Sequence, residues 1–561
     1  MSLFRKKDLA AMLAQAEDGG KGLKRTLGAG NLIALGVGAI IGAGLFVRTA
    51  AAAGQAAGPA VTLSFIVAAI GCAFAGLCYA EFAAMIPISG SAYAYSYVTM
   101  GETVAWIIGW ALIMEYALGA ATVSIAWSEY LNKLLGHRIP YEWCHSPFES
   151  LADATGAVRH GIMNAPALVI LLLLTLLLIK GTQESAMVNA VIVFVKVAIV
   201  LIFIVVGWQF IDTANHTPYL IPANQPKVLD GAGKVLADYS GVFKHGWGGV
   251  LGGAAIVFFA FIGFDAVSTA AQEAKNPKRD MPIGILGSLA VCTVLYILFG
   301  HVLTGVAPWT DFVDPTKGKE ASVAYAISEY MPGYGWLAKA VTIAILAGFS
   351  SVILVMLMGQ SRVFFSMAND GLLPKVFSEL HPKYRTPYKS NWILFVFVGA
   401  FAAFVPGSVA GDLTSFGTLF AFVLVSAGIW ILRVKSPNLE RPFKTPLVPL
   451  VPILGALICL AMILALDGQT LKVAFLWMVI GLDVYYLYSQ SNSKIFDGPS
   501  LAKTSYVTQM LPIVLATIGL IALAVITMDK VTVFIAIAQL ILLVFAMFNQ
   551  MTMLNKYTGK Q

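Results

Sequence analysis

Two apolar stretches of the sequence are interrupted by residues that do not suit a continuous membrane helix. The first, Gly36–Phe46, has glycines at positions 36, 38, 42 and 44, and the second, Val257–Thr269, contains Gly263 and Asp265. A glycine weakens a helix by about 1 kcal/mol relative to alanine. Unpaired backbone within lipid persists only where it is buried in protein or lines a cavity. The pattern predicts two interrupted helices around a polar site.

The ends of interrupted helices can bind a zwitterion. A helix N-terminus presents free N–H groups that suit a carboxylate, and the carbonyl groups of the opposing helix end accept from an ammonium group. An amino acid is the simplest such ligand. The predicted substrate-binding residues are Ile40, Ile41, Gly42, Ala43, Gly44, Phe259, Ala260 and Ile262. The alternative is that the glycines permit close helix packing, which Gly38 and Gly42 alone would also fit.

Three ionisable residues lie deep inside apolar stretches: Lys196, Glu115 and Asp265. A central lysine costs about 2.5–3.5 kcal/mol on insertion scales, and both ends of its span are far for a snorkelling side chain. We expect Lys196 to occupy the place where sodium-coupled carriers hold a cation, and to couple transport to protons. Glu115 or Asp265 would carry the proton, pair with Lys196 or form a wall of the site. The alternative for each acid is a structural hydrogen bond to tyrosine or backbone.

Three further residues, Phe259, Glu81 and His301, lie in or near these spans. Phe259 stands beside the second interruption, where its ring would act as a gate, although aromatic residues in spans mostly serve packing. Glu81 and His301 fall near span ends, which favours interfacial positions for both. The sequence has no metal-ligand cluster, P-loop or nucleophile–base pair, so it predicts no enzyme, metal, cofactor or ATP-driven pump.

The composition predicts that a bilayer surrounds these residues. Of 561 residues 58% are hydrophobic and 12% charged, with a mean hydropathy of +0.81, whereas soluble domains carry about 25% charged residues. A span needs roughly 20 apolar residues. Fourteen such stretches are centred near residues 38, 70, 114, 172, 197, 257, 294, 350, 398, 421, 456, 480, 517 and 540.

The interruptions fall in spans one and six, at matching places five helices apart, which is the strongest sequence indication of a transporter site. The predicted fold is therefore an all-α membrane protein with an inverted five-plus-five helix repeat and four additional C-terminal helices. The predicted segments are 1–27 (cytoplasmic), 28–210 and 245–432 (the two repeats), 446–550 (additional helices) and 551–561 (cytoplasmic tail).

Charge distribution predicts orientation. The net charge is +7, and most lysines and arginines fall in segments that lie inside if the N-terminus is cytoplasmic, which favours cytoplasmic N- and C-termini. The N-terminal residues lack an apolar signal-peptide region. No basic cluster lies in a soluble domain, so nucleic-acid binding is not expected. The five cysteines form no disulfide or zinc pattern. Prolines in Arg441–Pro452 predict a non-helical elbow.

Several runs together resemble the cationic amino acid transporter family of the amino acid–polyamine–organocation superfamily. They are Gly36–Phe46, Asn189–Ala198, Phe258–Thr269, Gly359–Pro374 and Arg441–Pro452. The resemblance spans roughly residues 25–550. It implies a leucine-transporter-like fold, alternating access, a proton-coupled role for Lys196 and gating by Phe259. It also implies an integral, multi-pass protein of a bacterial inner or plasma membrane.

Two features depart from the family pattern. Many relatives have Ser or Thr where this chain has Ala43, so backbone N–H groups must bind the carboxylate, and bacterial relatives often have twelve spans rather than fourteen. The small residues Ala39 and Ala43 leave room for a side chain, and Met356 and Met358 are expected to form one apolar wall, which favours a neutral substrate. We therefore expect a proton-coupled amino acid symporter whose partners are the amino acid, protons and lipid. An exchanger and, in another class, a non-transporting amino acid sensor are the alternatives. A small single-span partner subunit stays open.

Overall fold

The computed structural model describes residues 5–7, 27–86, 91–152, 158–180, 186–230 and 233–495, apart from positions 266, 269–270, 272–273, 315, 320 and 385, together with residues 517 and 539. The predicted spans near 517 and 540, and the tail 551–561, lie outside this described part.

Helices make up most of the described chain. The α-helices are α2 (Ala29–Ile40), α3 (Thr49–Ala52), α4 (Val61–Met85), α5 (Ser91–Thr99), α6 (Glu102–Leu134), α7 (Ala165–Lys180), α8 (Ala186–Gly207), α9 (Gly246–Val257), α10 (Pro277–Val306), α11 (Ser322–Tyr330), α12 (Gly335–Asn369), α13 (Tyr388–Phe404), α14 (Gly407–Lys435), α15 (Leu450–Leu464), α16 (Gly468–Val484) and α17 (Gln490–Asn492). Short 3₁₀ or π segments are η2 (Gly44–Arg48), η3 (Ala53–Ala57), η4 (Gly58–Ala60), η5 (Tyr141–Trp143), η6 (Trp208–Phe210), η7 (Thr213–His216), η8 (Phe258–Phe261), η10 (Trp309–Val313), η11 (Lys375–Ser378) and η12 (Tyr485–Ser489).

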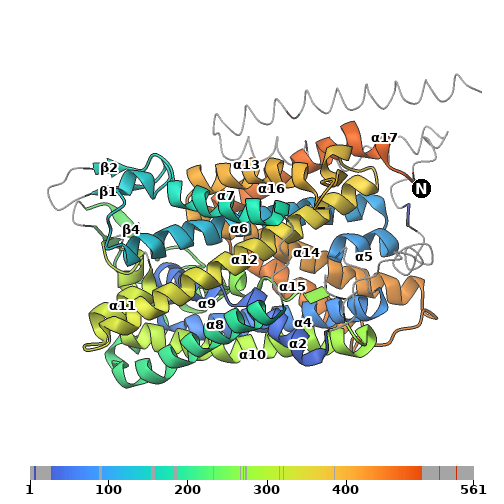
Figure 1. Ribbon diagram of the computed structural model, residues 1–561. Helices are drawn as coiled ribbons and strands as arrows, with labels where there is room; N and C mark the ends of the chain where they lie inside the picture. Colours follow the sequence, from blue (N-terminus) through green and yellow to red (C-terminus); the bar gives the residue numbers. More distant parts are fainter. Residues whose placement is uncertain are drawn as a thin grey trace, which may run out of the picture.

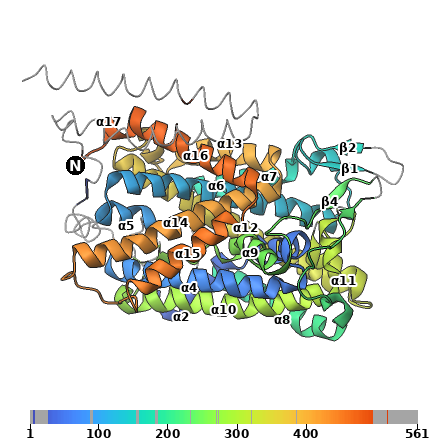
Figure 2. The same cartoon turned by 180° about the vertical axis from the view of Figure 1, so that it is seen from behind.

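The long helices run side by side between two ends of the molecule (Figures 1 and 2). One end carries two antiparallel hairpins and α11. The hairpins pair β1 (Ser150–Ala152) with β2 (Val158–His160) and β3 (Val228–Leu229) with β4 (Val235–Ala237). The first hairpin lies in the connection between α6 and α7, the second in that between α8 and α9, and α11 in that between α10 and α12, so these three connections gather at one end. The described N-terminal residues lie at the other end (Figure 1).

By length and composition, six helices of the described chain can cross a membrane. A seventh span is possible if α15 and α16, which meet at a bend of 116°, form one crossing. Four shorter apolar helices are Ala29–Ile40, Ala165–Lys180, Gly246–Phe261 and Tyr388–Phe404. The prediction of a multi-helix membrane protein is confirmed.

One connection between neighbouring helices is a tight turn, and another is the non-helical elbow predicted from its prolines. Helices α13 and α14 are joined by Val405 and Pro406 alone, as a tight turn requires. The elbow between α14 and α15 is non-helical, and Glu81 of α4 holds it in place. The buried Glu81 carboxylate accepts from Arg433 (2.8 and 2.9 Å) and from the backbone N–H of Thr445 (2.8 Å), and Arg441 lies 3.2 Å away. Glu81 is thus a buried structural acid rather than an interfacial one.

Candidate substrate site at two broken helices

The first predicted interruption is a break between α2 and η2. Helix α2 ends at Ile40, and Ile41 is extended, with φ −72° and ψ 105°. The next turn is closed by the N–H of Leu45, which donates to the carbonyl of Gly42 (3.1 Å). The first N–H groups of a helix have no acceptor within it. The backbone N–H groups of Gly42, Ala43 and Gly44 therefore stand at the start of the resumed helix, at the place predicted for the carboxylate.

The second predicted interruption follows η8. Helix α9 tightens into the 3₁₀ turn Phe258–Phe261, and the chain then becomes extended at Ile262, with φ −59° and ψ 134°. Gly263 follows with φ +114°, a conformation that glycine adopts readily and other residues rarely do. At this end the carbonyl of Phe259 accepts from the N–H of Ile262 (3.3 Å), and that of Ala260 accepts from the hydroxyl of Tyr296 (2.9 Å).

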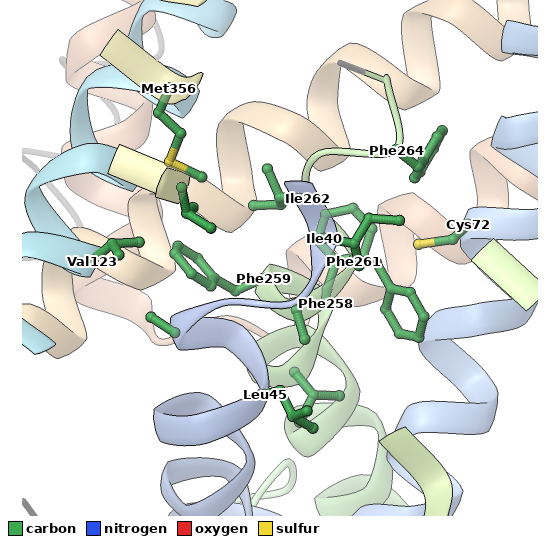
Figure 3. Packing of buried hydrophobic residues seen from close by; sticks show 14 of the residues in the cluster. Ile40, Leu45, Cys72, Val123, Phe258, Phe259, Phe261, Ile262, Phe264 and Met356 are labelled. Atoms are coloured by element: carbon green, nitrogen blue, oxygen red, sulfur yellow. The ribbon is translucent and has the colours of Figure 1, made fainter. Parts of the chain in front are cut away.

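The two breaks pack directly against each other. A Cβ atom added to Gly44 would lie 2.2 Å from Cα of Ala260, and one added to Gly263 would lie 2.9 Å from the carbonyl oxygen of Ala39. Gly44, which follows the first break, thus contacts Ala260, which precedes the second. Likewise Gly263, which follows the second break, contacts Ala39, which precedes the first. The structure brings together the eight residues predicted to bind substrate, and the side chains of Ile40, Phe259 and Ile262 lie in one cluster in Figure 3. Close helix packing, the alternative explanation, also applies to Gly42, whose added Cβ would meet Val352 of α12 at 3.0 Å, and to Gly36, whose added Cβ would meet Ser288 of α10 at 2.5 Å.

Two polar side chains bind the carbonyl groups at the end of α2. Lys196 of α8 is buried and donates from Nζ to the carbonyl oxygen of Gly38 (2.9 Å). Tyr296 of α10 lies 3.0 Å from the carbonyl oxygen of Ile40 and 2.9 Å from that of Ala260. An ammonium group at a helix C-terminus is favourable because the helix dipole is negative there. Lys196 therefore ties the C-terminal end of α2 to α8.

The two acids differ in their surroundings. Asp265 accepts from the hydroxyl of Tyr116 (3.1 Å) and from the N–H of Gly263 (3.3 Å). Glu115, on α6 next to Tyr116, is equally buried, but within the described chain neither of its carboxyl oxygens accepts a hydrogen bond of ordinary geometry. Thr418 of α14 lies beside this carboxyl group, yet its hydroxyl donates to the carbonyl of Thr414 (3.1 Å).

A buried arginine, which the sequence analysis did not single out, lies beside the predicted gate. Arg48 of η2 forms an ion pair with Asp412 of α14, and only 4% of its side chain is exposed. Its guanidinium carbon lies 6.0 Å from the ring centre of Phe259. In the sequence, Arg48 ends an apolar stretch, a position that indicates a charge at the membrane interface. Only the ion pair with Asp412 of α14 shows that it belongs to the site.

The walls near Phe259 are apolar. The Phe259 side chain points towards Val123 of α6 and Met356 of α12, whereas Phe261 points to the opposite side of η8 (Figure 3). Residues two apart on a helix do not share a face. Met358 is half-buried and lies on a different face of α12 from Met356, so the expectation that both methionines form one wall is wrong for Met358.

Comparison with known proteins identifies the family of this chain. A family model described as amino acid permease matches residues 27–485. The chain belongs to the amino acid permease family. It is 42% identical over 496 residues to the branched-chain amino acid permease BcaP of Bacillus subtilis (strain 168), covering 88% of this chain and 99% of that protein. It is 40% identical over 495 residues to the methylthioribose transporter of the same organism, with the same coverage.

A third relative links the permease to the family inferred from its motifs. It is 34% identical over 440 residues to the vacuolar cationic amino acid transporter 4 of Arabidopsis thaliana, covering 78% of this chain and 68% of that protein. The predicted resemblance is thereby confirmed. The permease is a multi-pass integral membrane transporter, and its relatives are transporters rather than enzymes.

Proposed function

We propose that this permease is a proton-coupled symporter of neutral amino acids with branched aliphatic side chains. The observation that carries the proposal is the pairing of opposed helix ends at the two breaks, where Gly44 and Ala260 are in backbone contact. The N–H groups of Gly42–Gly44 bind the substrate carboxylate, and the carbonyl groups of Phe259–Ile262 bind its ammonium group. Together these ends recognise the part that all α-amino acids share.

The proposed architecture is the inverted five-plus-five repeat with fourteen spans and cytoplasmic termini. The reciprocal contacts of Gly44 with Ala260 and of Ala39 with Gly263 support it, since a two-fold relation between the breaks produces such pairs. The breaks are buried, with Ile41 and Ala260 at 0% exposure and Phe259 at 3%. A solute therefore reaches them only when surrounding elements move, which is alternating access. We assign to Phe259 and the Arg48–Asp412 pair the role of a gate that closes one side of the substrate site.

The side-chain specificity follows from the walls. Val123, Phe259 and Met356 offer a branched aliphatic group an apolar surface, and burial of each methylene group contributes about 0.8 kcal/mol. A lysine or arginine side chain placed there would lose its hydration, and the carboxylate of Asp412 near Phe259 is already paired with Arg48. The name of the Bacillus subtilis relative, branched-chain amino acid permease, agrees with this assignment.

Proton coupling is assigned to Glu115 and Lys196. A charged carboxylate held away from water without hydrogen-bond donors is costly, and taking up a proton removes that cost. Among the described residues Glu115 has only the hydroxyl of Thr418 beside it and no donor of ordinary geometry, whereas Asp265 accepts from Tyr116 and Gly263 and serves to fix the second break. Release of a proton weakens the bond from Lys196 to Gly38, because a neutral amine is a poorer donor than an ammonium group, and this loosens α2 from α8.

Transport by purified permease in liposomes tests the proposal. An inward proton gradient together with an inside-negative potential should drive accumulation of labelled leucine, isoleucine or valine above the external concentration, and lysine should compete poorly. Accumulation unchanged by either gradient would exclude symport and favour exchange. A thermal-shift screen of the twenty amino acids and of methylthioribose measures specificity separately, because a ligand that binds the folded state stabilises it.

A further inference from the structure

The hydroxyl group of Tyr296 reaches both broken helices at once. Its oxygen lies 3.0 Å from the carbonyl oxygen of Ile40, the last residue of α2, and 2.9 Å from that of Ala260 in η8. A phenol carries one donated proton. The two carbonyl groups therefore share it, as in the three-centre hydrogen bonds found at helix ends.

The ring that carries this hydroxyl is held firmly. Tyr296 is fully buried on α10. The centre of its ring lies 5.4 Å from that of Phe65 on α4 and 5.3 Å from that of Phe261 in η8. Aromatic contacts at such separations stabilise a specific ring arrangement. The hydroxyl thus occupies a fixed point, and the two carbonyl groups are placed relative to that point.

The other contacts between the breaks are of a different kind. Gly44 packs on Ala260 and Gly263 packs on Ala39, and van der Waals packing limits how close two segments come. It does not select a direction, and it permits the segments to slide. A hydrogen bond prefers a nearly linear geometry and weakens steeply with misalignment. The shared bond at Tyr296 therefore fixes the angle and offset that packing leaves free.

We propose that Tyr296 is a positioning residue that sets the separation between the carboxylate and ammonium sites. This inference rests on the proposed function, since it assumes that one amino acid binds to both helix ends. Two groups in one molecule reinforce each other only when geometry lets both bind simultaneously. Tyr296 touches neither end of the substrate. It acts through the carbonyl groups of Ile40 and Ala260, which adjoin the two ends of the site.

The test compares a two-ended ligand with its one-ended analogues. L-Leucine carries both groups, 3-methylbutylamine lacks the carboxylate, and 4-methylpentanoate lacks the ammonium group. Their dissociation constants for purified wild-type permease and for Tyr296→Phe are measured by calorimetry or by competition with labelled leucine. In the variant we expect leucine to bind about tenfold more weakly, which is what loss of one hydrogen bond of about 1.4 kcal/mol gives. The one-ended analogues should bind almost unchanged.

A matched control removes a comparable hydroxyl away from the breaks. Tyr239 is also fully buried, and its hydroxyl donates to the carbonyl oxygen of Gly54 in η3. Tyr239→Phe should leave all three dissociation constants near their wild-type values. If Tyr296→Phe does not fold, Phe65→Leu provides a second variant, because it loosens the ring of Tyr296 but retains the hydroxyl. It should weaken leucine binding in the same selective way.

The outcomes separate this inference from the proposed function. If leucine binds wild-type permease no more tightly than its one-ended analogues do, the two-ended site itself is wrong. If leucine binds the wild type much more tightly and the variant keeps that advantage, only the role of Tyr296 is wrong. Equal weakening of all three ligands in the variant would also overturn the inference, because it would indicate general damage to the fold.

Discussion

Gly44 and Ala260 are in direct backbone contact, although one belongs to the first broken helix and the other to the second. A Cβ atom on Gly44 would lie 2.2 Å from Cα and 2.7 Å from the nitrogen of Ala260. Backbone atoms cannot swing aside as a flexible side chain can. The contact explains why position 44 is glycine, and it places the N-terminus of one half-helix beside the end of the other.

Replacement of Gly44 by alanine should therefore abolish uptake. The added methyl group has to push the breaks apart, so we expect a lowered melting temperature and loss of leucine binding in a thermal-shift assay. Gly30→Ala is the matched control, because Gly30 lies in α2, the first half of the same broken helix, with nothing within 4 Å of an added Cβ. It should leave transport intact and leave stability unchanged or raised by up to about 1 kcal/mol. Normal uptake by Gly44→Ala would argue against tight contact between the breaks.

Lys196→Met should abolish proton-driven uptake while the protein stays folded. Methionine fills a similar volume but cannot donate to the carbonyl of Gly38 or change its charge. Accumulation driven by a pH gradient measures the effect, and size-exclusion chromatography checks the fold. Lys180→Met, at the exposed end of α7, is the control and should behave like the wild type. Undiminished pH-driven accumulation by the Lys196 variant would remove this lysine from the mechanism.

Glu115→Gln and Asp265→Asn should fail in different ways. Glutamine at 115 keeps the size of the side chain but cannot exchange a proton, so gradient-driven accumulation should stop while leucine counterflow continues. Asparagine at 265 alters the acceptor of Tyr116 and Gly263, which should weaken leucine binding and counterflow together. The two assays on the same liposome preparations distinguish the roles. The reverse pattern would assign the proton to Asp265.

The Arg48–Asp412 pair should be coupled energetically. Removing one partner of a buried ion pair leaves an unpaired charge and typically costs about 3–5 kcal/mol. Arg48→Gln and Asp412→Asn should each lower the melting temperature, and the double variant should lose less than the sum of both. Lys278→Gln is a control on an exposed pair with Glu440 (3.6 Å), where we expect no measurable change. Additive losses in the Arg48 and Asp412 variants would show that the pair does not act as a unit.

Acid should destabilise the loop around His216, which lies outside the spans in η7. Burial, with a further contribution from the charge of His301, lowers the pKa of His216 below its ordinary value of 6.5. The unfolded chain therefore binds this proton more readily, so the stability contributed by neutral His216 is present above pH 6.5 and is lost as the pH falls through the folded-state pKa. The melting temperature of the wild type should fall more steeply between pH 7.5 and 5 than that of His216→Gln. Parallel curves would contradict this prediction.

The sequence by itself determined the positions of the breaks. Glycines at 42, 44 and 263 weaken helices locally, and a helix end is a local event that a local signal can reveal. Lys196, Glu115 and Asp265 could also be identified from the sequence. Insertion of an ionisable residue into a membrane span costs free energy, so such a residue is expected to have a partner or a function. The prolines of the elbow after α14 likewise prevent helix formation, and this local effect does not depend on where the segment lies in the fold.

Only the tertiary structure decided which groups satisfy the broken ends and the charges near them. Tyr296 is one of 20 tyrosines, and nothing local distinguishes it, because its hydroxyl matters only through carbonyl groups that are 256 and 36 positions away. Arg48 depends on Asp412, 364 positions along the chain. The distinction between Glu115 and Asp265 also came from neighbours contributed by other helices. Hydrogen bonds and ion pairs depend on distance in space, so a periodic pattern along the chain can show where a partner is needed but not which residue provides it.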